Sequence, residues 1–263
     1  MSRRARTSPA KVRVAIGALA LLLLLIGAWE LYVDLGGADP LILPAPHSIA
    51  KALYTDRSLL WRNFLVTAQE VLLGILVATV LAFALSVLLH FSPVVRRAVY
   101  PLLVASQALP IPIVAPVLVL WLGFGILPKL IVIALVSFFS IVVTTLAALA
   151  GVDPALLKLM RTFDATRLRI FRHVELPAAL PGLFTGAKIA VAVAVIGAVF
   201  AELSGSSSGL GYLFQQANAQ ILMPRAYAAV VILSAFAIAL FAALTVAERL
   251  LLPWAYQPRG DLA

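Results

Sequence analysis

The polar residues of this chain offer few combinations that could perform chemistry. Its three histidines, His47, His90 and His173, lie far apart, with no carboxylate cluster and no paired spacing typical of metal ligands. The absence of cysteine excludes thiol chemistry, iron–sulfur clusters and thiolate zinc sites. No Gly-x-x-x-x-Gly-Lys-Ser/Thr phosphate loop, nucleophile elbow or acid/base pair occurs. We therefore expect no catalytic residue, no metal site and no cofactor bound by this chain, which is not an enzyme by itself.

Polar side chains inside apolar runs are the remaining candidates, because placing them in a membrane is costly. Gln107 precedes three prolines, Pro110, Pro112 and Pro116, each of which lacks the amide hydrogen that a helix would use. The carbonyls freed in this way are tolerated at membrane depth only against protein or a water-filled path. We therefore predict that this stretch is irregular and that it lines a pathway together with Gln107.

Aromatic and acidic residues supply further pathway candidates. Phe138, Phe139 and Ser140 could present an aromatic and hydroxyl surface to a planar heterocycle, or could serve only in packing. Glu202 precedes a loop rich in serine and glycine, so it could act in gating or docking, or could be a helix-end residue that reaches interfacial water. Solvation at the membrane interface is expected for two further carboxylates, Glu70 and Glu248.

The amino-acid composition indicates which class of fold must position these residues. Of 263 residues, 63% are hydrophobic and only 12% are charged, and the mean hydropathy is +1.08. A soluble domain averages about 45–50% apolar and about 25% charged residues. The chain is therefore predicted to be an all-α polytopic membrane protein, because its apolar runs have the length of spanning helices. Six spans are expected: Val14–Val33, Leu65–Leu89, Val99–Leu122, Leu130–Ala150, Leu183–Leu203 and Ala226–Leu252.

The basic residues predict the orientation of these spans. The net charge of +9 comes from short clusters between apolar runs, which favours a topological role and not nucleic-acid binding. With the N-terminus inside, fifteen of the 20 Lys and Arg residues lie on the cytoplasmic side. We thus expect a cytoplasmic tail over 1–13, a six-span domain over 14–252 and a cytoplasmic tail over 253–263. The first span resembles a signal peptide, but its length and its lack of a cleavage site favour an uncleaved anchor.

Segment 151–181 is the one long cytoplasmic interruption, and its local signals predict two short helices. Asp153 followed by Pro154 is typical of a helix start, since Asp caps the first turn and Pro fits its first position. The first helix should run to about Phe163 and be followed by a turn at Asp164.

A second short helix is expected over Arg167–Val174, capped by Thr166. It should stop before Pro177, because proline disfavours helical geometry in the residue that precedes it. Lys158 and Arg161 are three residues apart and share one face of the first helix. The resulting helix–turn–helix could dock in a groove of a partner protein, or could lie on anionic lipid headgroups.

The stretch Asp164–Pro177 resembles the EAA loop of binding-protein-dependent ABC importer permeases. That pattern reads Glu-Ala-Ala, three residues, Gly, nine residues and Ile-x-Leu-Pro, and Val174-x-Leu176-Pro177 stands at the matching distance. Asp164 replaces the glycine, and Lys158-Leu159-Met160 replaces Glu-Ala-Ala. Asp tolerates a left-handed turn better than most residues, so the loop should keep its fold. The resemblance implies that an ATPase is contacted by Lys158, Arg161, Asp164, Ala165, Val174, Leu176 and Pro177.

The resemblance extends over roughly residues 60–254. The runs that are similar to the nitrate/sulfonate/taurine group of these permeases are Gln107–Pro116, Leu120–Gly125, Pro128-Lys129, Ala201-Glu202 and Gly209–Tyr212. Ala115–Gly125 and Ser137–Ser140 look most like permeases for thiamine pyrimidine precursors, with riboflavin permeases close behind.

The resemblance implies a transmembrane permease subunit in the bacterial inner membrane. Two copies would form the path, two cytoplasmic ATPase subunits would supply energy from ATP, and an external binding protein would deliver the solute. Contact with membrane lipid is also expected. Riboflavin, sulfonate, taurine and nitrate are alternative substrates. An ion-coupled carrier is the alternative mechanism, although paired broken helices in inverted repeats and midplane carboxylates, which are typical of that class, are not evident.

Overall fold

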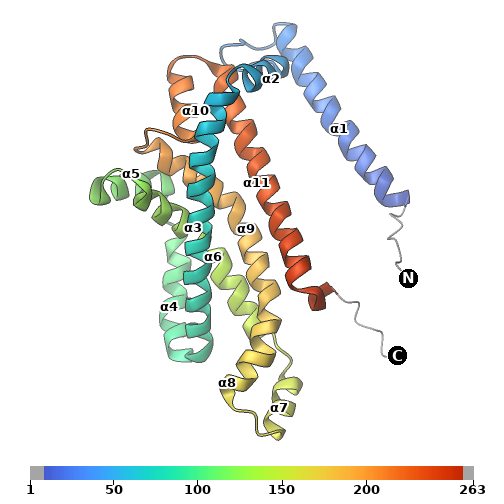
Figure 1. Cartoon of the computed structure of the whole chain (residues 1–263), viewed down its shortest axis with the longest axis vertical. Coiled ribbons are helices and arrows are strands. Elements are labelled where there is room, and N and C mark those ends of the chain that lie inside the picture. The colour runs from blue at the N-terminus through green and yellow to red at the C-terminus, as the bar shows by residue number, and fades with distance from the viewer. Residues whose placement is uncertain (1–8, 257–263) are drawn as a thin grey trace.

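The computed structural model describes residues 9–256, which contain helices and no strand. The α-helices are α1 (Pro9–Asp34), α2 (Pro46–Thr55), α3 (Arg57–Phe91), α4 (Pro93–Ser106), α5 (Ile111–Leu122), α6 (Ile126–Ala150), α7 (Pro154–Thr162), α8 (Arg167–Ile170), α9 (Leu176–Leu203), α10 (Leu210–Ala219) and α11 (Met223–Leu251). A π-helical turn (Phe171–Glu175) joins α8 to α9, and a 3₁₀ turn (Pro253–Tyr256) follows α11. Figure 1 shows α2 and α10 at one end of the molecule, the α2 end, and α7 and α8 at the other, the α7 end.

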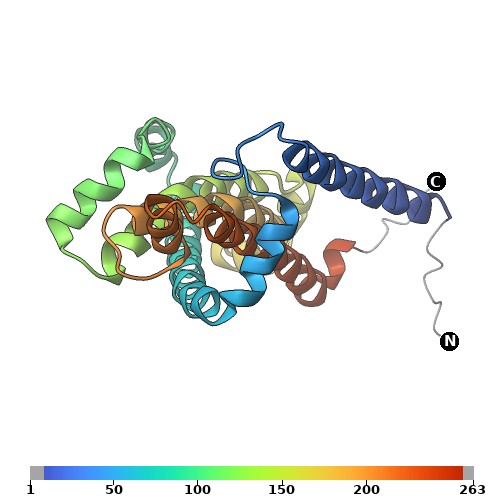
Figure 2. The ribbon, with the colours of Figure 1, turned by 90° about the horizontal axis from the view of Figure 1, so that it is seen from above.

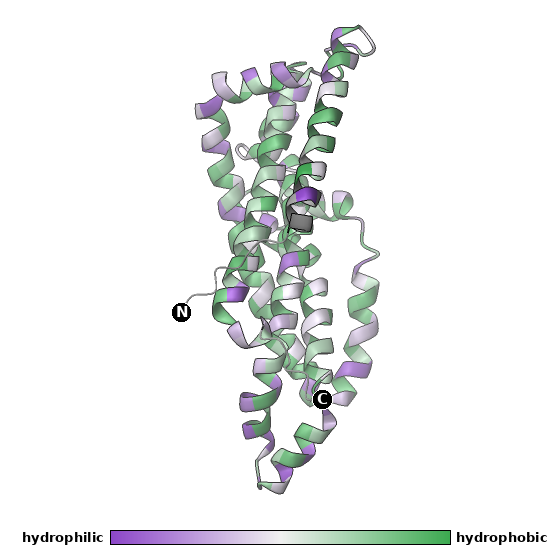
Figure 3. Ribbon diagram, turned by 90° about the vertical axis from the view of Figure 1, so that its right-hand side faces the viewer, coloured by the Kyte–Doolittle hydropathy of each residue, from purple (hydrophilic) through white to green (hydrophobic). Residues whose placement is uncertain are grey.

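Five helical stretches within residues 9–256 are long and apolar enough to cross a membrane, and the pair α4–α5 makes a sixth span if it is counted as one. Apolar residues cover most of their length, as the hydropathy colours in Figure 3 show. The all-α, polytopic class is therefore confirmed. The expected third span, Val99–Leu122, is not one continuous helix: it is divided between α4 and α5, which are bent by 101° relative to one another, as in a broken span or a re-entrant loop. Residues 1–8 and 257–263 of the two expected tails lie outside the described residues.

Close packing of α3, α6, α9 and α11 forms the core, and α6 against α9 is the most extensive helix pair. Small residues make this approach feasible. A Cβ atom on Gly186 of α9 would collide with Thr144 and Ile141 of α6, and one on Gly74 of α3 would collide with Ile133. The positions of these glycines therefore determine where the helices cross.

Two parts of the chain lie away from this core, on opposite sides of it (Figures 1 and 2). One is the bent pair α4–α5. The other is α1, whose residues Leu21, Leu22, Leu23, Leu24 and Leu25 are between 53% and 65% exposed. Such apolar surface requires cover by lipid or by another protein.

The expected end of the second short helix before Pro177 is wrong. The helix that begins at Arg167 continues through the π-helical turn into α9 and ends at Leu203. In the π-helical turn the backbone N–H of Leu176 bonds to the carbonyl of Phe171, so that Pro177 falls in the first turn of α9. The π-helical turn interrupts the regular i→i−4 hydrogen bonding just before Pro177, which is why the helix can pass through a residue that has no amide hydrogen.

Candidate functional site

Glu202, at the end of α9, is fully buried and joins three helices at the α2 end. One carboxylate oxygen accepts a hydrogen bond from Thr67 Oγ1 of α3 at 2.6 Å. The other accepts the backbone N–H of Gly211, in the first turn of α10, at 2.5 Å. The N-cap of α10 is a glycine without a side chain, so a carboxylate from another helix satisfies its free amides and its positive end. The interpretation of Glu202 as a water-solvated helix end is therefore wrong.

The two glycines of the Gly-Leu-Gly run are required by this arrangement. Gly209 has a φ of 113°, and a Cβ atom on either Gly209 or Gly211 would collide with the Glu202 carboxylate. Asn63 Oδ1 accepts the N–H of Gly209 at 2.8 Å, and Thr67 Oγ1 accepts the following amide at 2.8 Å. Three successive amides at the start of α10 are thus bonded to side chains of α3 and α9.

A buried ion pair lies beside this network. Lys129 Nζ of α6 is 2.6 Å from Glu70 Oε1 of α3, and it also donates to Ser206 Oγ at 2.6 Å. Lys129 and Glu70 are only 7% and 4% exposed. The expected interfacial solvation of Glu70 is therefore wrong, and Lys129 is not a loop residue that only marks topology. The sequence signal for this ion pair is a lysine near the start of an apolar helix, but the sequence does not identify the partner of that lysine.

A cavity of about 430 Å³ opens next to the ion pair. Its lining consists of Phe124, Gly125, Lys129, Gly205, Ser206, Ser207 and Ser208. The serine hydroxyls both donate and accept, as Ser206 shows by donating to the Ser208 carbonyl at 2.5 Å. The cavity can therefore receive a polar solute through hydrogen bonds and does not depend on a single charged contact.

The proline-rich stretch forms the bend between α4 and α5. Gln107 is the C-terminal cap of α4 and is exposed, and Pro110 is the N-cap of α5 with an extended backbone. The predicted irregularity over Pro110 to Pro116 is misplaced, because Pro112 and Pro116 both lie within α5. Pro112 occupies the first turn, where its missing amide costs nothing. The irregular backbone is therefore confined to the residues between α4 and α5.

The structure does not bring Phe138, Phe139 and Ser140 onto one surface. Consecutive residues of a helix point about 100° apart, since a turn holds 3.6 residues. Phe138 lines an apolar groove of about 350 Å³ with residues of α3 and α6, and both Phe138 and Phe139 pack against the core. The hydroxyl of Ser140 donates to the carbonyl of Ser137 in its own helix at 2.9 Å. These contacts fit packing better than a shared surface for a heterocycle.

At the α7 end, the expected helix starts are present. Asp153 caps α7 by accepting a backbone amide at 2.8 Å, and Thr166 caps α8 with a longer contact of 3.4 Å. Asp164 adopts the left-handed conformation with a φ of 53°. Lys158 and Arg161 are exposed on α7, which buries none of its residues.

The other predicted contact residues lie apart from this tip. Val174 lies in the π-helical turn, Leu176 and Pro177 begin α9, and all three are half-buried. Ala165 is half-buried in the turn, where its amide bonds to the Met160 carbonyl at 3.1 Å. The structure therefore separates the predicted set into an exposed tip and a half-buried base.

Two contacts not expected from the sequence attach this tip to the core. His90 Nε2, at the end of α3, lies 3.0 Å from Glu175 Oε2 in the π-helical turn. The Arg167 guanidinium donates to the Phe91 carbonyl at 3.3 Å and stacks on the Phe91 ring. A displacement of α7 and α8 would thus be transmitted to α3 as well as to α9.

A third ion pair connects α9 to α11. Lys188 Nζ lies 2.8 Å from Glu248 Oε2, and the Tyr256 hydroxyl donates to the same oxygen at 2.7 Å. The hydrogen bond to Glu248 raises the pKa of the Tyr256 hydroxyl above its ordinary value. Glu248 is only 4% exposed, so its expected solvation at the interface is wrong.

Known proteins resemble this chain in both sequence and fold. Residues 70–255 match the family described as binding-protein-dependent transport system inner membrane component. The formylaminopyrimidine transport permease protein ThiX of Halalkalibacterium halodurans is 37% identical over 233 residues, which cover 88% of this chain and 93% of that protein. The riboflavin transport system permease protein RibX of Chloroflexus aurantiacus is 34% identical over 242 residues, covering 91% and 90%.

Solved structures support the fold independently. A chain from inward-facing structures of the methionine ABC transporter MetNI superposes with a TM-score of 0.61 at 21% identity, covering 76% of this chain and 98% of that one. The family match and the permease relatives, not the fold alone, exclude the alternative of an ion-coupled carrier. The chain is not an enzyme and binds no cofactor itself, because permeases of this kind use ATP through a partner ATPase. It belongs to the family of binding-protein-dependent transport system inner membrane components, and is a multi-pass ABC importer permease that acts with an ATPase and a substrate-binding protein.

Proposed function

We propose that this permease imports a thiamine pyrimidine precursor. The observation that carries the proposal is the 37% identity to a formylaminopyrimidine permease over 93% of that protein's length. The polar cavity beside Lys129 is compatible with such a solute, since a substituted pyrimidine has ring nitrogens and an amine that exchange hydrogen bonds with hydroxyl groups. Riboflavin is the second candidate, because the riboflavin permease is 34% identical.

Uptake by the complete importer distinguishes these substrates. The permease, its ATPase and its binding protein would be reconstituted in proteoliposomes with ATP. Labelled formylaminopyrimidine, riboflavin, taurine and nitrate would then be supplied one at a time on the side of the binding protein. We expect ATP-dependent uptake of formylaminopyrimidine alone. Uptake of riboflavin in its place would transfer the assignment to that branch of the family.

Two copies of the chain are proposed to enclose the pathway, with the α2 end outside and the α7 end in the cytoplasm. The bend between α4 and α5 supports this arrangement, because the carbonyls at the end of a helix lack regular intrahelical partners and at membrane depth are tolerated only against water or protein. Gln107 at the bend and the serine-lined cavity are the pathway residues that we favour. Pro110, Pro112 and Pro116 shape the bend, while Phe138, Phe139 and Ser140 support it through packing. Glu202 holds the loop above the cavity in place.

The α7 end is proposed to contact the ATPase through Lys158, Arg161 and the Asp164 turn. Their exposure and the projection of α7 from the core support this assignment (Figure 1). Val174, Leu176 and Pro177 would then act as the base that transmits movement into α9. The alternative, in which α7 lies on lipid headgroups, predicts that cross-links from α7 reach lipid and not the ATPase.

A further inference from the structure

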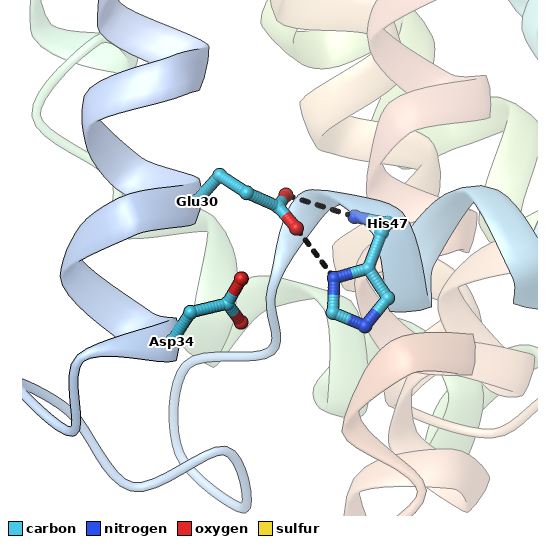
Figure 4. Close-up of side chains that lie close together, drawn as sticks. All are labelled: Glu30, Asp34 and His47. Atoms are coloured by element: carbon cyan, nitrogen blue, oxygen red, sulfur yellow. Dashed lines mark hydrogen bonds and ion pairs between the residues drawn. The ribbon is translucent and has the colours of Figure 1, made fainter.

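Three ligand-type side chains meet where α1 joins α2. Glu30 and Asp34 lie in the last turns of α1, and His47 lies in the first turn of α2 (Figure 4). One ligand atom from each lies within 4.8 Å of the other two. The expectation that no histidine lies in a carboxylate cluster is therefore wrong. The sequence signal that could have indicated it is a pair of carboxylates four residues apart.

Two hydrogen bonds account for the position of Glu30 but not for that of Asp34. Glu30 Oε1 lies 2.5 Å from His47 Nδ1, and Glu30 Oε2 accepts the backbone N–H of His47 at 3.1 Å. This amide is in the first turn of α2, whose N-cap offers no side-chain acceptor. Asp34 takes part in none of the ion pairs found among residues 9–256.

The charges at this junction favour a bound cation. Glu30 and Asp34 are four residues apart on one helix face, where like charges repel. Both lie at the carboxyl end of α1, which carries the negative end of the helix dipole, and the last turn holds no basic residue. A cation between the two carboxylates would remove the repulsion and would lie at the negative end of the α1 dipole.

We propose that Glu30, Asp34 and His47 form a binding site for a divalent transition-metal ion such as Zn²⁺. An imidazole nitrogen with two carboxylate oxygens suits zinc better than magnesium or calcium, which prefer oxygen ligands alone. Ligand atoms on a tetrahedral zinc ion lie roughly 3.3 Å apart. The widest separations, which are at most 4.8 Å, would therefore close by at most roughly 1.5 Å, and the 2.5 Å contact between Glu30 and His47 would open. Their exposure permits this movement, because the side chains of His47 and Glu30 are 65% and 30% exposed.

The backbone between the ligands is ordered by local hydrogen bonds. Gly36 is left-handed with a φ of 78°, and the amide of Gly37 bonds to the Tyr32 carbonyl at 2.9 Å. The metal would therefore bind beside a turn whose backbone is already held by hydrogen bonds. Because α1 lies away from the core, an ion shared with α2 would fix the position of α1 (Figure 1).

Calorimetric titration of the intact importer with Zn²⁺ tests the site. The complex would be held in nanodiscs with an affinity tag that contains no histidine. We expect one zinc ion per permease chain, and a loss of affinity of at least tenfold in His47→Ala and in Asp34→Asn. His173→Ala, which changes an exposed histidine in the π-helical turn at the α7 end, should bind zinc like the wild type.

Two results would overturn the proposal. The first is a wild-type complex that takes up no zinc at micromolar concentrations, which would leave only the Glu30–His47 hydrogen bonds. The second is unchanged binding in both ligand variants, which would place the zinc elsewhere. Asp34→Asn keeps the size of the side chain and breaks no ion pair, so it remains informative if His47→Ala fails to fold. The titration needs no transported solute, so its outcome is separate from that of the uptake experiment.

Discussion

The ammonium of Lys129 lies 2.6 Å from a carboxylate oxygen of Glu70, and both side chains are buried between α6 and α3. Each charge stabilises the other, because an isolated charge in a low-dielectric interior is very unfavourable. The pair also positions Ser206, which bonds to Lys129 and lines the polar cavity. The stability of α3–α6 packing and the shape of this cavity therefore depend on the same two residues.

Removal of one member of this pair should be far more harmful than removal of both. We expect Lys129→Met to lower the free energy of unfolding by about 3–5 kcal/mol, the usual cost of stranding a buried charge. The double variant Lys129→Met/Glu70→Met should recover most of that loss. Denaturant titration of the purified permease measures both, with the exposed Lys51→Met as control. A loss in the double variant equal to the sum of the losses in Lys129→Met and in Glu70→Met would show that the pair is not coupled.

Substitutions of Glu202 and of a glycine beside its carboxylate should also lower the stability of the chain. Glu202→Ala leaves the amides of Gly211 and Tyr212 without their acceptor and should destabilise the chain by about 1–3 kcal/mol. Gly209→Ala should also destabilise it, because its Cβ atom would meet the same carboxylate. Gly27→Ala serves as the control, since its Cβ atom would have open space. Thermal unfolding followed by circular dichroism compares the three variants, and a wild-type midpoint for Gly209→Ala would contradict the packing described here.

The sequence predicts the helical class because apolar runs of spanning length have few alternatives in lipid. It also predicts the start of α7 and the turn at Asp164, which depend on signals a few residues long. It does not predict that Lys129 faces Glu70, since 59 residues separate them and the pairing depends on how α3 and α6 cross. For the same reason, hydropathy alone predicts that Glu70 and Glu248 are solvated, whereas the structure shows both carboxylates in ion pairs.

The bend in the third span is another feature that the sequence predicts only in part. The prolines indicate that a regular helix cannot cover the whole stretch. They do not indicate where it breaks, because Pro112 falls in the first turn of α5 and Pro116 lies inside α5 without ending it. The relation between α4 and α5 depends on the packing of α4 against α3 and of α5 against α6 and α9, which sequence spacing does not report.

The Asp164 turn should tolerate glycine and reject proline. Glycine adopts a positive φ without strain, so Asp164→Gly should keep ATPase binding and ATP-driven uptake near wild-type levels. Proline fixes φ near −65° and would remove the hydrogen bond from the Asp164 amide to the Arg161 carbonyl. Co-purification with the ATPase and uptake in proteoliposomes provide the two measurements. Full uptake by Asp164→Pro would exclude this turn from coupling.

The orientation of the chain can be tested by reporter fusions. The excess of Lys and Arg on one side predicts that both termini are cytoplasmic. A fusion after Gly36, in the turn that follows α1, should therefore report an external location. A fusion after Asp153, before α7, should report the cytoplasm. The reverse pair of signals would invert the proposed assignment of the α2 and α7 ends.

Accessibility of the bend between α4 and α5 tests the pathway directly. The chain contains no cysteine, so single cysteines at positions 107, 111 and 114 can be labelled without removing a native thiol. Gln107 is exposed at the bend, whereas Ile111 and Val114 are half-buried in the first turns of α5. If the bend faces a cavity that opens to one side at a time, labelling by a membrane-impermeant reagent should differ between nucleotide-bound and nucleotide-free complexes. Position 107 should change most, because its side chain lies outside both helices. Protection at all three positions in both states, in a transport-competent complex, would place the pathway elsewhere.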